Sequence, residues 1–210
     1  MANVVFGGFR PVATLSGAPL PRPLYRAVAN NYGTPIRTYD VVACTTDGTL
    51  IIGAAAGAGA LIGYVTGVSY VTTAGRVTGR NLPKSTTFSP TTVGSINESI
   101  VEFIPATPDV ICEVQADEGT TFATIATQVS ALQENCDIAD ATATTDQSYS
   151  SQCLDISTHA TATFNFRIIG IVGYSVNGLQ LGLNDPTVTR FAFQVVCNES
   201  VWPIGTATGV

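Results

Sequence analysis

Short runs of β-branched and aromatic residues, separated by turn signals, follow one another from residue 39 to the C-terminus. In residues 110–117 apolar and polar side chains alternate with the period of two that is typical of a strand with one buried face. Asn177-Gly178 separates two further runs, and this pair favours a tight β-hairpin because a type I′ turn needs positive φ at both central residues. The pattern predicts an all-β chain, folded as a barrel or a sandwich.

At most one short helix is predicted. Its apolar residues recur at intervals of three and four and are Phe122, Ile125, Val129 and Leu132. Residues 76–99 and 137–152 are polar and rich in Ser and Thr, which predicts surface loops.

Residues 1–38 are predicted to form an extended N-terminal arm, and residues 39–210 the β domain. Five prolines in the arm restrict φ and remove backbone donors, which excludes a long helix or a central strand. Its arginines have two interpretations: a solvated charged face, or an interface in which guanidinium groups meet carboxylates and aromatic rings. On the second interpretation, the expected contact residues are Phe9, Arg10, Pro11, Val12, Leu15, Arg22, Leu24, Tyr25, Arg26 and Arg37.

Charge is scarce and sorted along the chain. Residues 1–97 hold seven basic and two acidic residues, and residues 98–210 hold two basic and thirteen acidic residues. Charged residues make up 11% of the chain, less than half of the usual share of about 25%, so we expect much of the surface to be covered by partners. The acidic balance argues against nucleic-acid binding, which needs a concentrated cationic face.

Residues 48–75 contain no charged residue and are long enough to span a bilayer. Their apolar residues come in short clusters separated by Gly and Ala, and the flanking charges give little orientation signal. Two buried strands around a Gly/Ala loop explain the segment better than a membrane helix. A membrane-active role of residues 48–75 stays as an alternative.

No catalytic or metal site is predicted, and no cofactor. The five cysteines lack zinc-ligand spacing and are expected to be reduced and mostly buried, although a Cys136–Cys153 bridge is possible. Asp155, Ser157 and His159 would share one face of a strand, but catalytic triads are assembled from separate segments. The chain is therefore not expected to be an enzyme.

Four segments, in this order along the chain, resemble capsid cement (head decoration) proteins of tailed bacteriophages. They are Phe9-Arg10-Pro11-Val12 with Leu15-Ser16-Gly17-Ala18-Pro19, the run from Leu61 to Val68, the strand from Pro108-Asp109-Val110 to Glu113-Val114-Gln115, and Phe166-Arg167-Ile168-Ile169-Gly170. Each motif is short, and the weight lies in their common order.

The resemblance implies a β-rich protein that binds the outer surface of an HK97-fold shell and staples neighbouring capsomers. The expected partners are the major capsid protein and further copies of the chain itself, as a trimer rather than a dimer, with no nucleic acid and no membrane. We would then expect synthesis in the host cytoplasm and a final location on the virion. The alternative is a receptor-binding or fibre-type surface module, in which loops 76–105 and 137–160 would carry recognition.

Overall fold

The computed structural model describes residues 8–28, 34–46, 48–53, 61–72, 75–79, 81–82, 99–117, 125–140, 150–160, 164–172, 175–176, 179–180 and 192–202. Its elements are β1 (Arg10–Thr14), β2 (Leu24–Ala27), β3 (Ile36–Arg37), β4 (Val41–Cys44), β5 (Leu50–Ile52), β6 (Leu61–Thr72), β7 (Gly75–Gly79), β8 (Asn81–Leu82), β9 (Ser99–Pro105), β10 (Val110–Gln115), α1 (Ile125–Ser130), β11 (Asn135–Asp140), β12 (Gln152–Ala160), β13 (Phe166–Ile171), β14 (Ser175–Val176), β15 (Leu179–Gln180) and β16 (Ala192–Cys197). The predicted all-β fold, with an extended N-terminal segment and one short helix, is confirmed.

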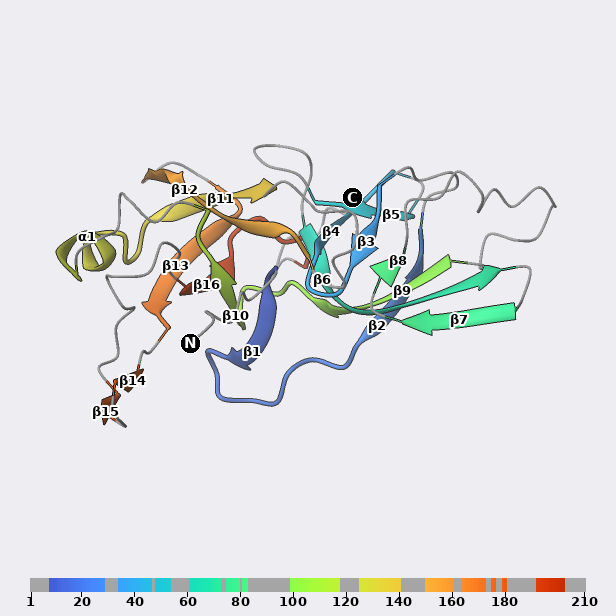
Figure 1. Ribbon diagram of the computed structural model, residues 1–210, viewed down its shortest axis with the longest axis horizontal. Helices are drawn as coiled ribbons and strands as arrows, with labels where there is room; N and C mark the ends of the chain where they lie inside the picture. The colour runs from blue at the N-terminus through green and yellow to red at the C-terminus, as the bar shows by residue number, and fades with distance from the viewer. Residues whose placement is uncertain are drawn as a thin grey trace.

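Two antiparallel sheets lie side by side along the long axis of the molecule (Figure 1). Sheet A has the order β1-β10-β16-β13-β11-β12. Sheet B has the order β2-β9-β6-β4-β5, and β7 pairs with β6. The short pairs β3-β8 and β14-β15 complete the described strands.

Both sheets curl until a single parallel bridge joins two chain segments that are not neighbours in the sheet order. In sheet A, Ala116 after β10 bridges Leu154 of β12. In sheet B, Val28 after β2 bridges Leu50 of β5. A curled sheet encloses one face, and each sheet accordingly has its own hydrophobic cluster.

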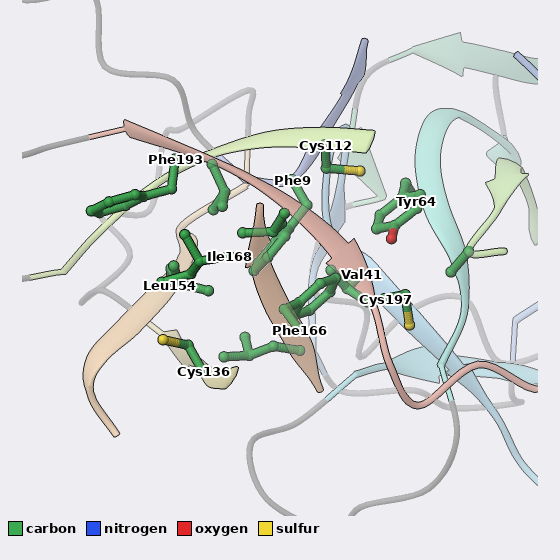
Figure 2. Packing of buried hydrophobic residues seen from close by; sticks show 14 of the residues in the cluster. Phe9, Val41, Tyr64, Cys112, Cys136, Leu154, Phe166, Ile168, Phe193 and Cys197 are labelled. Carbon is green, nitrogen blue, oxygen red and sulfur yellow. The ribbon is translucent and has the colours of Figure 1, made fainter. Parts of the chain in front are cut away.

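The larger cluster lies inside sheet A and is rich in aromatic rings (Figure 2). Phe9 stacks on Phe166 with ring centroids 4.4 Å apart. Tyr64 comes from β6 of sheet B and lies 6.4 Å from the Phe166 ring. The cluster inside sheet B is mainly aliphatic and consists of Val28, Ile36, Val42, Leu50, Ile62, Val65, Val68, Val101 and Phe103.

Hydrogen bonds between the sheets hold the two halves together. The buried amide of Gln152, at the start of β12, accepts from the Val41 backbone N–H at 2.6 Å and donates to the Gly53 carbonyl at 2.8 Å. After β16 the chain crosses to sheet B, where the Trp202 indole N–H donates to the Ile62 carbonyl at 2.6 Å. Because these buried groups satisfy each other, the junction is specific as well as apolar.

Several predicted elements are confirmed. β10 places Val110, Cys112 and Val114 on the buried face, as the alternation indicated. β14 and β15 pair antiparallel on either side of the predicted turn, with Val176 opposite Leu179, and residues 177–178 themselves lie outside the described ranges. The predicted strands within residues 48–75 are β5 and β6, and the loop between them lies outside the described residues.

Two predicted loops are partly wrong. β7 and β8 occupy part of 76–99, where they pair with β6 and β3, and the strands β11 and β12 take the ends of 137–152. In each case a neighbouring strand supplies the backbone hydrogen bonds, so tertiary pairing overrides weak local propensity.

The short helix is correctly placed, and Leu132 of its predicted apolar face packs against the cluster of sheet A, but Val129 does not. Val129 of α1 is 47% exposed, whereas Gln128 is fully buried. The Gln128 side chain therefore faces the protein interior, although Gln128 is not one of the regularly spaced apolar positions. Within the described ranges, no helix has the length and apolar character needed to cross a membrane.

Candidate interaction surface

The N-terminal segment crosses from one sheet to the other along one side of the molecule (Figure 1). β1 is an edge strand of sheet A, and β2 is an edge strand of sheet B. Between and within them, three large apolar side chains are exposed: Leu15 by 58%, Leu24 by 39% and Tyr25 by 65%. We call Leu15, Arg22, Leu24 and Tyr25 the N-terminal surface.

The remaining predicted contact residues take other positions. Phe9 is fully buried in the cluster of sheet A, so it is a core residue of its own chain and not a surface anchor. Arg37 is also buried, and its backbone N–H donates to Asp40 at 2.6 Å. Pro11 and Val12 are half-buried within β1.

The arginines differ in how far their own chain uses them. Arg10 makes an ion pair with Glu113 of β10 at 2.5 Å. The Arg26 guanidinium donates to the Cys44 sulfur at 2.7 Å and to the Gly48 carbonyl at 3.3 Å. Arg22 is exposed and makes no hydrogen bond or ion pair with another residue in the described ranges. Its charge is therefore available to a partner.

The edge of β1 is poorly suited to pair with a further strand. The strand contains Pro11 and an irregular register between Pro11 and Ala13. At its end the Gly17 N–H donates to the Thr14 carbonyl at 3.2 Å, and the Thr14 hydroxyl donates to the Ala18 carbonyl at 2.6 Å. Prolines, bulges and covering turns all discourage a further strand from pairing.

Tyr25 is held at the edge of sheet B by the neighbouring strand. It lies opposite Glu102 of β9, which also accepts a hydrogen bond from the Thr66 hydroxyl at 2.8 Å. Hydrogen bonding to the Glu102 carboxylate, and then its negative charge, raises the pKa of the Tyr25 hydroxyl. No local sequence pattern predicts this role of Glu102, because the β2–β9 pairing joins segments far apart in the chain.

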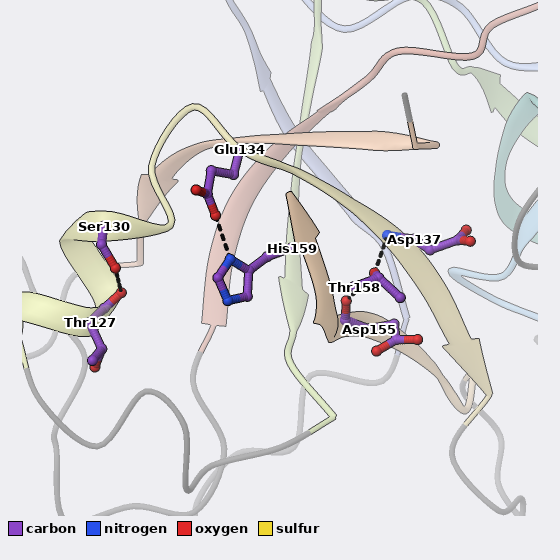
Figure 3. A network of polar contacts seen from close by, with 7 residues as sticks. All are labelled: Thr127, Ser130, Glu134, Asp137, Asp155, Thr158 and His159. Carbon is purple, nitrogen blue, oxygen red and sulfur yellow. Dashed lines mark hydrogen bonds and ion pairs between the residues drawn. The ribbon is translucent and has the colours of Figure 1, made fainter. Parts of the chain in front are cut away.

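The lone histidine does not form a triad. The His159 ring contacts the Glu134 carboxylate (Figure 3), while the Ser157 hydroxyl donates to Asp155 at 2.5 Å. Asp155 thus binds its strand neighbour and Glu134 binds the histidine, so serine, histidine and aspartate are not connected in series. Among the residues that the structure describes, no group of three or more potential metal ligands comes together.

The cysteines are all free thiols, as predicted, so Cys136 and Cys153 do not form a bridge. Cys112, Cys136, Cys153 and Cys197 are buried, and Cys44 is half-exposed. Burial raises the pKa of Cys136 to about 12 and that of Cys197 to about 12. A thiol with so high a pKa holds its proton and is a poor nucleophile at neutral pH.

Comparison of the chain with protein-family models, with curated proteins and with solved structures finds no match. The geometry of the N-terminal surface is therefore the basis for assigning a role.

Proposed function

We propose that this chain is a structural protein of a virion, a decoration protein that binds the outer surface of an HK97-fold capsid and staples neighbouring capsomers. The observation that carries the proposal is the N-terminal surface, which leaves Leu15, Arg22, Leu24 and Tyr25 exposed along the segment that connects the two sheets. Aromatic residues and arginine are enriched at the centre of protein interfaces. The resemblance of four ordered motifs to capsid cement proteins supplies the identity of the partner.

The stapling mechanism is multivalent. The N-terminal surface is a small contact area, so one copy alone would bind weakly. A homo-oligomer, with a trimer favoured over a dimer, would present several such surfaces at fixed spacing and raise the effective concentration of each on the shell. Low overall charge would limit repulsion between copies that crowd on one particle.

The test is occupancy on expanded shells of the phage that encodes the chain, measured by co-sedimentation and cryo-EM. The triple variant Leu15→Ala/Leu24→Ala/Tyr25→Ala is expected to lose at least about tenfold in affinity, because interface anchors of this kind contribute about 1–2 kcal/mol or more each. Val129→Ala removes an equally exposed apolar side chain from α1 and is the matched control, with occupancy unchanged.

Wild-type occupancy of the triple variant would refute the proposal. Point variants are the right tool here, because deletion of residues 1–38 would also remove the buried Phe9 and the strands β1 and β2. A loss of binding after deletion would then report on folding and not on the surface.

A further inference from the structure

Charge is sorted in the fold as well as along the chain. Sheet A, with α1, β11 and β12, lies toward one end of the long axis, and β7 of sheet B lies at the other end (Figure 1). We propose that copies of this chain associate head to tail, with β7 of one copy against an acidic surface beside β12 of the next. The proposal rests on the charges of the two ends, and it supplies an interface for the homo-oligomer of the proposed function.

Three partly exposed carboxylates lie along β12, and we call Asp117, Glu134 and Asp155 the acidic surface. Asp155 belongs to the strand itself. The Asp117 carboxylate accepts a hydrogen bond from the Ile156 backbone N–H at 3.1 Å, and the Glu134 carboxylate contacts the His159 ring (Figure 3). The three side chains come from separate segments, and contacts with β12 bring them together.

A fourth carboxylate strengthens the negative potential of the acidic surface. Asp137 of β11 is buried and lies directly opposite Asp155 in the antiparallel pair. After burial, which is the main cause, the charges of Glu134, Asp155, Asp117 and Asp137 raise the pKa of the nearby Cys136 thiol. Like charges at opposite positions of a sheet are destabilising, so a cation from outside the chain would relieve the repulsion.

The cations of this half leave the acidic surface negative. Arg10 is paired with Glu113 of β10. His159 carries a charge only when it is protonated. Arg167 of β13 is exposed, and its single charge faces the three carboxylates of the acidic surface and Asp137. The excess of negative charge is therefore available to a basic partner.

The opposite end of the molecule carries positive charge. β7 pairs with β6 and with no other described strand, and its first four residues are exposed. One of them is Arg76, whose guanidinium donates to the Ser69 hydroxyl at 3.0 Å. Residues 48–97 contain no acidic residue and three basic ones, Arg76, Arg80 and Lys84.

The nearest strand carboxylate of sheet B is engaged elsewhere. Glu102 of β9 accepts a hydrogen bond from the Thr66 hydroxyl at 2.8 Å and lies opposite Tyr25. Arg76 makes no ion pair with Glu102 or with another residue in the described ranges. The charge of Arg76 is therefore open to a carboxylate of a second molecule.

The two ends complement each other and not themselves. Two β7 strands in contact would bring Arg76 against Arg76, and two acidic surfaces would bring carboxylates together. Complementary potentials favour the unlike ends, and like charges suppress the other pairings. Each head-to-tail contact leaves one unused end on either copy, so association continues into a ring or a chain. A closed ring of three copies is the trimer of the proposed function.

The first test is sedimentation equilibrium of the full-length protein at concentrations up to about 1 mM. Species larger than a dimer are expected as the concentration rises. The Kd is expected to increase at least about threefold between about 50 and 500 mM NaCl, because the Debye length falls from about 14 Å to about 4 Å.

Two charge reversals separate the position of a charge from the net charge. Arg76→Glu is expected to raise the Kd at least about fivefold, because attraction to the acidic surface becomes repulsion. Arg167→Glu changes the net charge by the same amount within sheet A and is the matched control, with the Kd unchanged or lower. Circular dichroism and denaturation verify that both variants are folded.

A mixing experiment tests the head-to-tail geometry. Asp117→Asn/Asp155→Asn weakens the acidic surface, while each amide oxygen can still accept the hydrogen bonds from the Ile156 and Ser157 backbone N–H groups. This variant and Arg76→Glu are each expected to associate at least about threefold more weakly than the wild type. Mixed in equal amounts, they are expected to form pairs that stop at two copies, because only one intact β7 and one intact acidic surface meet.

Four outcomes would each overturn the inference: no association at about 1 mM, wild-type association that ends at a dimer, equal weakening by Arg76→Glu and Arg167→Glu, or no recovery in the mixture. The shell experiment is separate. Association in solution without shell binding would remove the proposed function alone. Shell binding by a chain that stays monomeric in solution would remove the head-to-tail contact alone.

Discussion

Sheet A and sheet B are both antiparallel and curled, but they use the N-terminal segment differently. Sheet A takes in the large ring of Phe9 as part of its aromatic cluster. Sheet B takes the smaller Val28 and Ile36 into a mainly aliphatic cluster and leaves Leu24 and Tyr25 of β2 exposed. The comparison indicates that the segment stabilises both halves of the fold, and that its largest exposed apolar side chain lies on β2.

The largest effect is expected from the aromatic cluster. Phe166→Ala should lower the free energy of unfolding by about 3–5 kcal/mol, because it removes the ring that stacks on Phe9 and packs near Tyr64. Chemical denaturation followed by fluorescence and circular dichroism measures the change. A loss below about 1 kcal/mol would contradict the assignment of Phe9 and Phe166 to one packed core.

The junction between the sheets should come next. Gln152→Ala leaves the Val41 N–H and the Gly53 carbonyl without their partner, at a cost of about 1–3 kcal/mol for each buried group. Because this amide joins the two halves, we also expect two separated unfolding transitions in place of one. Gln152→Glu is the matched control, since a carboxylate can still accept from Val41 but cannot donate to Gly53.

Two glycines of β6 in sheet B differ in the space that is available for a side chain. A Cβ at Gly63 would meet the Phe103 ring and lie 2.7 Å from the Ile104 carbonyl oxygen, so Gly63→Ala should destabilise by about 1–3 kcal/mol. A Cβ at Gly67 would come no closer than 3.9 Å to its neighbours. Gly67→Ala should be neutral or stabilising by up to about 1 kcal/mol, and thermal unfolding of the pair distinguishes the two sites.

Exposed residues of the N-terminal surface should matter least to folding. Leu15→Ala and Leu24→Ala are expected to change the free energy of unfolding by no more than about 0.5 kcal/mol. A larger loss in either variant would mean that the side chain belongs to the fold and is not available to a partner.

Ionisation of the buried thiols should not change the free energy of unfolding at neutral pH, but should lower it increasingly in alkali. Burial raises the pKa of Cys136 and of Cys197 from 9.0 to about 12, so the unfolded chain loses these protons first as the pH rises. The free energy of unfolding should therefore fall between pH 9 and pH 12. The fall should be smaller in Cys136→Ala, when each protein is compared with its own value at pH 7. With a thiol reagent at pH 8, the half-exposed Cys44 should react well before the other four.

Sequence patterns predicted most of the strands, but not which of Gln128 and Val129 in α1 is buried. The alternation in β10 and the Asn177-Gly178 hairpin are local signals, and the structure confirms both. Gln128 is buried and Val129 exposed because the packing of α1 against its neighbours outweighs a weak apolar spacing. The polar residues of β7 and β11 become strands only because β6 and β12 pair with them.

The predicted contact residues illustrate the same limit. Phe9, Leu15 and Leu24 are alike as apolar positions in a proline-rich segment, yet one is in the core and two are exposed. Composition cannot separate them, because burial depends on which sheet lies against each position.

The sequence by itself determined the all-β class, the extended N-terminal segment and the uneven distribution of charge, since periodicity, proline chemistry and charge are properties of neighbouring residues. Only the tertiary structure decided that this segment forms an edge of each sheet and that Gln152 joins them. These features depend on contacts between segments far apart in the chain, such as Val41 and Gln152, which no local pattern encodes.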